Sequence, residues 1–323
     1  MTLMEAPPGR PLNRSTPAPR ELVHRTALAE VLLTDVRAVG GHRFTAAAQW
    51  PCSHPTFDRA GDGRHNPLLI AETLRELGIC IPLQYYAVPP ESRLLIGELE
   101  FSIDPEAEPR ARHAGSEITC EVRADRFRPV EHSPPRSLGL TARYLADGRE
   151  FARAQGIARI LSPAAYRAIR GRDTRSIGPA PAPGSPAAAL AFAPPKPGLV
   201  GVAQAQDVLI GMDRGGRVRL FPADPYHPFF FDHPSDHIPG LVVLEAVRQA
   251  VARHLAGAPT RMVSCELRAL RFTEADPPAH IAYTVAGRSC DFEVWQDGAL
   301  TAAGSLGFAS PDGASAVRRH PPG

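Results

Sequence analysis

The stretch HPTFDRAGDGRHNPLLIAETLRE (54–76) recurs without a gap as HPFFFDHPSDHIPGLVVLEAVRQ (227–249). In each copy a His-Pro pair is followed, at the same spacing, by a glutamate and then by an arginine three residues further on. Upstream, Val31-Leu32-Leu33 matches Val208-Leu209-Ile210 when a few residues are dropped. Chance does not readily produce several distinct positions in one order at matched spacing. The sequence therefore indicates an internal duplication.

Each copy is expected to contain one buried helix, at 67–81 and at 239–254, with a proline near the first turn. The first two turns of the second helix are apolar almost all round, which is typical of a helix without a solvent-exposed face. Asp147-Gly148 and Asp297-Gly298 lie between alternating apolar runs and predict tight hairpin turns. We therefore expect an α+β fold in which, in each half, an antiparallel sheet wraps around a central helix.

Pro-rich segments divide the chain, because they can neither continue a helix nor pair as central strands. The longest is GPAPAPGSPAAALAFAPPKPG, which ends at Gly198. The expected organisation is a disordered N-terminal segment (1–21), a first domain (22–170), a linker (171–198), a second domain (199–311) and a flexible tail (312–323).

Composition excludes several classes of function. The 36 basic and 34 acidic residues leave a net charge of +2 with no dense basic run, so nucleic acid is not an expected partner. The single lysine, Lys196, lies among prolines, which argues against Schiff-base chemistry and a phosphate-loop lysine. Five cysteines without close pairing favour a reducing cytoplasm. No segment approaches the ~18 consecutive apolar residues that a membrane span requires, so no membrane partner is expected.

The two Glu/Arg pairs are the first candidates for chemistry. At about 100° per residue, Glu72 and Arg75 share one helix face, as do Glu245 and Arg248. Desolvation raises the pKa of such a carboxyl group, while the neighbouring guanidinium lowers it. The alternative is an ordinary ion pair at an exposed helix edge. Because the spacing occurs twice in buried helices, we favour pairs that face a ligand.

The loop before the second helix is the other candidate. The start of that helix provides free backbone N–H groups near Gly240 and Leu241, where a carbonyl oxygen that gains charge could be stabilised. His233 and His237 could relay a proton or hold a thioester, or they could only satisfy hydrogen bonds within the loop.

Two other kinds of site are weaker. His233, Asp236 and His237 resemble a metal ligand set, but they lie on a Pro-flanked loop and no further ligand is apparent. Ser235 lacks a Gly-x-Ser-x-Gly elbow, and the cysteines lack a nucleophile motif. We expect no metal, no cofactor and no covalent intermediate.

Four segments together resemble the A-factor biosynthesis family of actinobacteria, double-hotdog enzymes that make γ-butyrolactone-type signals. They are VHRTALAEVLLTD (23–35), FTAAAQWPCSHPTF (44–57), NPLLIAETLRELG (66–78) and FDHPSDHIPGLVVLEAVRQA (231–250). The likeness spans about 22–310 and implies a tandem hotdog fold. The second loop and helix also resemble hotdog dehydratases that act on acyl carrier protein, although here the interval from His233 to Glu245 is two residues shorter.

The resemblance implies transfer of a β-ketoacyl group from acyl carrier protein to a hydroxyl of dihydroxyacetone phosphate. The ester can then close to a phosphorylated butenolide, a precursor of butyrolactone-type or furan-type signals. Motif positions carried over from the family are Glu72, Glu245 and Arg248. Glu245 is assigned as the base, Arg248 as the clamp for phosphate or carbonyl, and Glu72 with Arg75 as the counterpart. On this assignment, Glu245→Gln and Arg248→Ala each abolish transfer.

The halves are expected to differ in role, because Asn66-Pro67 replaces Pro239-Gly240 and Glu76, whose carboxylate would repel phosphate, replaces Gln249. One half-site then does the chemistry while the other binds or supports structure. The alternatives are a dehydratase or thioesterase acting on acyl carrier protein or coenzyme A, and a non-catalytic acyl-binding protein. Two fused hotdogs already form a pseudo-dimer, so the protein is expected to be a monomer or a homodimer.

Overall fold

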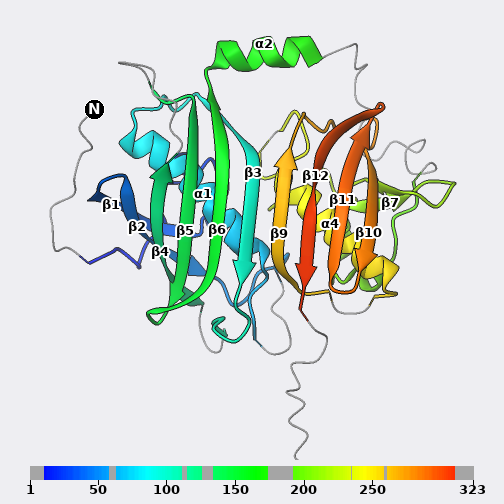
Figure 1. Cartoon of the computed structure of the whole chain (residues 1–323), viewed down its shortest axis with the longest axis horizontal. Coiled ribbons are helices and arrows are strands. Elements are labelled where there is room, and N and C mark those ends of the chain that lie inside the picture. Colours follow the sequence, from blue (N-terminus) through cyan, green and yellow to red (C-terminus); the bar gives the residue numbers. More distant parts are fainter. Residues whose placement is uncertain are drawn as a thin grey trace, which may run out of the picture.

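The computed structural model describes residues 11–57, 63–110, 115–125, 134–173, 192–233, 235–257 and 260–309. Their twelve strands form one continuous antiparallel sheet, in the order β1-β2-β4-β5-β6-β3-β9-β12-β11-β10-β8-β7. Figure 1 shows the sheet curling around the two helices α1 and α4, which lie side by side behind it. This confirms the expected α+β fold, a tandem hotdog with one central helix in each half.

The first half contributes one edge of the sheet and the second half the other. The two halves join where β3 pairs with β9, with Leu99 opposite Leu267. The strands are β1 (Leu33–Gly40), β2 (Arg43–Trp50), β3 (Arg93–Ile103), β4 (Ser116–Asp125), β5 (Ser137–Ala146), β6 (Arg149–Leu161), β7 (Ile210–Met212), β8 (Val218–Leu220), β9 (Met262–Ala269), β10 (His280–Ala286), β11 (Ser289–Gln296) and β12 (Ala299–Phe308).

Both predicted hairpins are present. Asp147-Gly148 joins β5 to β6, and Asp297-Gly298 joins β11 to β12. All four residues have positive φ, as a two-residue hairpin turn that follows the strand twist requires.

The helices α1 (Leu68–Tyr85) and α4 (Gly240–His254) begin where the sequence predicts. Val242, Leu244 and Val247 of α4 are fully buried, as the all-round apolar pattern indicated. The first helix extends past the expected end at 81, because the turn after Pro82 continues to Tyr85 before the amide of Tyr86 bonds the Pro82 carbonyl. No described helix is long and apolar enough to cross a membrane.

The duplication extends to side-chain contacts. In the first half, His54 Nε2 lies 3.0 Å from Glu30 Oε2, and its Nδ1 accepts the amides of Thr56 and Phe57. In the second half, His227 Nε2 lies 2.8 Å from Asp207 Oδ1, and its Nδ1 accepts the amides of Phe229 and Phe230. The repeated His-Pro motif therefore fixes the loop ahead of each helix.

Some segments expected outside the domains are part of them. Within 11–21, expected to be disordered, the Ala18 amide donates to the Leu33 carbonyl at 2.7 Å and the side chain is buried. Within the expected linker, Ala193 bridges to Met212. A Pro-rich chain can pair in this way because it needs only a few amides beside a strand. Residues 1–10, 174–191 and 310–323 lie outside the described residues.

The boundary expected at 170 falls inside a helix. Helix α2 (Pro163–Asp173) lies across the top of the sheet in Figure 1 and follows directly on β6. Its Arg170 forms ion pairs with Asp236 and Glu274 of the second half. The helix therefore ties the halves together.

Candidate functional site

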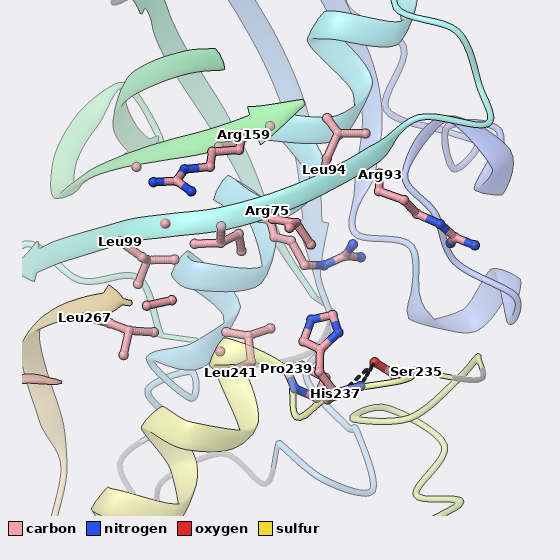
Figure 2. Close-up of a pocket in the computed structure, with 18 of the residues that line it drawn as sticks. Arg75, Arg93, Leu94, Leu99, Arg159, Ser235, His237, Pro239, Leu241 and Leu267 are labelled. Atoms are coloured by element: carbon pink, nitrogen blue, oxygen red, sulfur yellow. Dashed lines mark hydrogen bonds between the residues drawn. The ribbon is translucent and has the colours of Figure 1, made fainter. Parts of the chain in front are cut away.

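A cavity of about 910 Å³ lies at the seam between the two halves. Its walls come from α1, β3, β6, β9, the start of α4 and the loop before α4. In Figure 2, Leu99, Leu241 and Leu267 gather on one side, while Arg75, Arg93 and His237 lie on the other; Arg159 is drawn above Leu99, and Leu94 is drawn near Arg93. The volume is at the upper end of the range for small-molecule sites, and the polarity is divided along its length.

The apolar part owes its room to small residues. Gly78 of α1 lines it, and a Cβ added there would meet nothing closer than the Leu140 side chain at 4.0 Å. Gly156 of β6 lies where a Cβ would come within 3.3 Å of Leu74, so the chain passes close to the helix there. This part fits a flexible acyl chain.

Glu72 anchors the polar part and is fully buried. Its Oε1 lies 2.8 Å from Arg25 Nη2 and 2.7 Å from Arg75 Nη2, and Arg75 Nε donates to its Oε2 at 2.8 Å. Burial raises the pKa of Glu72, but the two guanidinium groups outweigh it and hold the pKa below its ordinary value. Glu72 is therefore a fixed anion that positions two cations, and it is poorly suited to accept a proton.

Arg25 links this group of charged side chains to the second half of the chain. It donates to the Phe229 carbonyl at 2.8 Å, and its guanidinium lies 4.5 Å from the centre of the Phe229 ring. It also lies 3.5 Å from Asp232, whose other oxygen accepts the Thr26 amide at 2.8 Å. Loop residues of the second half are thereby fixed against the helix of the first.

Asp232 and His233 form a hydrogen-bonded pair, with 2.6 Å between Oδ1 and Nδ1. Burial raises the pKa of Asp232, but His233, the Thr26 amide and Arg25 bring it down to about 2. The side chain of His233 is 49% exposed. His233 is thus oriented at the mouth of the cavity, and no residue that the structure describes hydrogen-bonds to its second ring nitrogen.

His237 is held in a similar way. Its Nδ1 lies 2.9 Å from Asp236, and its ring contacts Phe272 edge-on. Tyr166 of α2 donates to the same carboxylate at 2.6 Å. Within the described part of the chain, no group of three or more His, Cys, Asp or Glu residues is arranged to hold a metal ion.

The N-terminus of α4 opens onto the cavity. Gly240 and Leu241 both line it, and Pro239 provides no side-chain cap for the first turn. The first amides of a helix have no partner within it, so they can bind a substrate oxygen. By contrast, Asn66 Oδ1 accepts the Leu68 amide at the start of α1, at 3.0 Å.

The second Glu/Arg pair does not line this cavity. Arg248 Nη2 lies 2.6 Å from Glu245 Oε1, the Gln249 amide donates to the same oxygen at 3.0 Å, and Arg248 also bonds the Val200 carbonyl. Both side chains are largely buried, so the pair is not an exposed-edge ion pair. The roles of Glu245 as base and Arg248 as clamp stay predictions.

Glu76 also lies outside the cavity, contrary to the expectation that it would repel a bound phosphate. Its carboxylate accepts the amides of Leu32 and Leu33, at 2.8 Å for Leu33, in a fully buried position. Burial, and then the charge of Glu72, raise its pKa to about 8. Gln249 fills the same place in the second half, where it accepts the Leu209 amide.

The sequence did not single out His24, Arg25 or Arg93, which all line the cavity. Burial, and then the charges of Arg75, His233 and Arg93, lower the pKa of His24 to about 4. Arg93 is exposed at the start of β3, with its guanidinium 5.7 Å from the centre of the Tyr166 ring. The available signal was a difference between the repeats, because no His-Arg pair occurs at the corresponding place in the second.

Comparison with known proteins adds independent evidence. The model of the A-factor biosynthesis hotdog domain matches residues 9–162 and 191–307. The 2-oxo-3-(phosphooxy)propyl 3-oxoalkanoate synthase of Streptomyces virginiae is 30% identical over 267 residues, covering 81% of this chain and 85% of that protein. The synthase of the same name from Streptomyces griseus is 32% identical over 278 residues, covering 82% and 84%.

Among solved structures, an acyl-ACP thioesterase from Bacteroides thetaiotaomicron superposes with a TM-score of 0.50. It is 11% identical, with 82% of this chain and 98% of that chain covered. At that identity the match supports the shared fold only.

Proposed function

The chain belongs to the A-factor biosynthesis hotdog family, and on that premise we propose that it transfers a β-ketoacyl group from a thioester to dihydroxyacetone phosphate. The product is the 2-oxo-3-(phosphooxy)propyl ester of a 3-oxoalkanoate, the compound in the names of its relatives. The observation that carries the proposal is one cavity with an apolar end and an arginine-rich end, joined at an uncapped helix start.

Each part of the substrates has a matching part of the cavity. The acyl chain lies along the leucines near Gly78, and the thioester oxygen accepts the amides at Gly240 and Leu241. The phosphate pairs with Arg75 and Arg93, since Nη1 of Arg75 and the guanidinium of Arg93 have no hydrogen-bond or ion-pair partner among the described residues. The hydroxyl then lies beside the activated carbonyl, which is the main catalytic requirement.

The reaction exchanges one acyl acceptor for another. The hydroxyl loses its proton, its oxygen bonds to the carbonyl carbon, the C–S bond breaks, and the thiol leaves with a proton. In the ester, the CH₂ between the two carbonyls is acidic and lies near the ketone of the glycerone unit. Aldol-type closure with loss of water therefore gives the phosphorylated butenolide.

The protein groups have distinct roles in this proposal. Glu72 positions Arg25 and Arg75, while His233 and His237 contact the thioester and the acceptor at the mouth. Because Glu245 and Arg248 do not line the cavity, the proposal gives them a structural role in the second half in place of the base and clamp roles expected from the family resemblance.

We further propose that the donor is an acyl carrier protein in the cytoplasm. Arg159 and Arg271 are exposed at the cavity and make no ion pair with a described acidic residue. They can steer an anionic carrier and its phosphopantetheine arm toward the mouth. All five cysteines are free, in keeping with a reducing compartment.

The test is incubation of the purified protein with a β-ketoacyl carrier-protein thioester and dihydroxyacetone phosphate, followed by mass spectrometry. The proposal predicts the phosphorylated ester or butenolide, formed only when both substrates are present. Release of free acid at the same rate without the acceptor would identify a thioesterase instead. Loss of water from a β-hydroxyacyl thioester would identify a dehydratase.

A further inference from the structure

The two halves place the same backbone turn against the two Arg side chains. The Arg25 amide bonds the Arg20 carbonyl at 3.0 Å, as the Val202 amide bonds the Pro197 carbonyl at 3.2 Å. Arg75 donates to the Val23 carbonyl in one half, and Arg248 donates to the Val200 carbonyl in the other. By this register His24 is the structural equivalent of Gly201.

Both residues lie in the left-handed region, with φ of 50° for His24 and 66° for Gly201. Glycine adopts this conformation freely, whereas a side chain there is strained. A Cβ at Gly201 would come within 3.1 Å of the Arg248 guanidinium. Gly201 in the second half is therefore the residue type that this left-handed backbone favours. His24 in the first half is a residue type that the same backbone disfavours. Such strain is typically retained at functional positions.

We propose that His24 is the general base that removes the proton from the acceptor hydroxyl. This inference rests on the proposed acyl transfer and supplies its missing proton acceptor. The imidazole lines the polar part of the cavity, and no described residue hydrogen-bonds to either ring nitrogen.

The other titratable groups of the cavity are less suited to this role. Glu72 and Asp232 are held as anions by guanidinium groups. His233 and His237 each have one ring nitrogen bonded to an aspartate, and His233 is also exposed at the mouth. His24 alone among the described imidazoles of this cavity has both nitrogens open.

The charged neighbours of His24 link its basicity to substrate binding. After burial, its pKa is lowered by Arg75 on α1, His233 before α4 and Arg93 on β3. The first and last of these are the arginines proposed to bind the phosphate. A bound phosphate dianion offsets their charge and makes the imidazole a stronger base when the acceptor is in place.

In the step itself, an imidazole nitrogen takes the hydroxyl proton as the oxygen bonds to the thioester carbonyl carbon. When the C–S bond breaks, the imidazolium returns that proton to the departing thiolate. The imidazole is regenerated, and the net change is alcohol plus thioester to ester plus thiol.

Two substitutions at position 24 distinguish the loss of the imidazole from a change in backbone strain. His24→Asn keeps a polar residue that tolerates the left-handed conformation, and His24→Gly restores the residue found at 201. Both variants should fold, with the unfolding midpoint of the glycine variant unchanged or raised. Turnover of each should fall by about 10²–10⁴-fold, the usual contribution of general base catalysis. His280→Asn, on β10 outside the cavity, is the matched control and should retain wild-type turnover.

Added imidazole gives the decisive readout. It should restore part of the turnover of His24→Gly, increasingly as the pH rises from about 6 to 8 and the imidazole becomes neutral, and should leave His24→Asn unchanged. Turnover of both variants within threefold of wild type, or lost turnover that imidazole does not restore, would overturn the assignment. If the wild-type protein itself forms no ester, the proposed function fails, which is a separate result.

Discussion

The two central helices of this protein carry the same ion pair near their starts, yet only the Glu72–Arg75 pair lines the cavity. Glu72–Arg75 and Glu245–Arg248 have nearly identical geometry, with the shortest N–O distance 2.7 Å in one and 2.6 Å in the other. The surroundings differ: Val251, fully buried, occupies the helix position equivalent to Gly78. The comparison teaches that a motif shared by both repeats reports common ancestry and structure. In the proposed mechanism the two pairs differ in role because the residues around them have diverged.

Neutralising each glutamate in turn tests whether the two ion pairs contribute unequally to turnover. Glu72→Gln releases two arginines at the cavity, so turnover per folded molecule should fall by about 100-fold or more, as expected for misplaced substrate-binding groups. Glu245→Gln should change turnover by less than about tenfold, because the disturbed side chains lie outside the cavity.

Both variants should lose stability, by on the order of 3 kcal/mol, because each leaves a buried guanidinium without its counter-charge. Denaturant unfolding measures this loss, and rates are then compared under conditions where both variants are folded. A larger loss of turnover in Glu245→Gln than in Glu72→Gln would indicate that Glu245 is the base, as the sequence-based assignment has it.

The second prediction concerns a substitution that gives the first helix the side chain found at the equivalent position of the second, Val251. Gly78→Val should fill the apolar end of the cavity and lower kcat/KM for a long β-ketoacyl thioester by about 10²-fold, with a smaller loss for short chains. A series of thioesters of increasing length measures this.

The control is Val251→Ala, which should cost about 1–3 kcal/mol of unfolding free energy through the cavity it leaves and spare the chain-length profile. A uniform loss across all chain lengths in Gly78→Val would mean that Gly78 does not border the acyl chain.

The third prediction separates two arginines of the cavity. Arg93→Ala should raise KM for dihydroxyacetone phosphate by about tenfold, because it removes one charge-assisted contact to the phosphate. Arg159→Ala should instead raise KM for the carrier-bound thioester, an effect that should weaken with added salt. Steady-state kinetics with each substrate varied in turn distinguishes them. Equal effects of both variants on both substrates would remove the division of roles.

The smallest effect concerns Glu76 and its counterpart Gln249. Because the pKa of Glu76 is raised to about 8 in the folded protein, the folded state binds its proton more tightly than the unfolded state does. Its contribution to stability is full below the unfolded pKa of about 4.5 and is lost as the pH rises toward 8. Glu76→Gln should therefore unfold at a higher temperature than wild type at pH 8, with the difference shrinking toward pH 5. A constant difference across this range would contradict the prediction.

Much of the fold could be predicted from the sequence because the signals were local and repeated. The all-round apolar turns of α4 and the two Asp-Gly pairs specify their elements directly. The site was harder to predict, since Arg25, Asp232 and Glu72 meet only when the two halves of the chain join at β3 and β9. His24 gave no periodic signal, and its left-handed backbone becomes apparent only when its turn is compared with that of Gly201.

The central claim is that substrate binds at the seam beside α1. The most direct test is a crystal structure of the protein with a stable thioether analogue of the β-ketoacyl donor and dihydroxyacetone phosphate. The acyl chain of the analogue should lie beside Gly78, and its thioester-equivalent carbonyl should lie at the amides of Gly240 and Leu241. The phosphate of the acceptor should lie at Arg75 and Arg93. Ligand density beside Glu245 and Arg248, with the seam cavity empty, would contradict it.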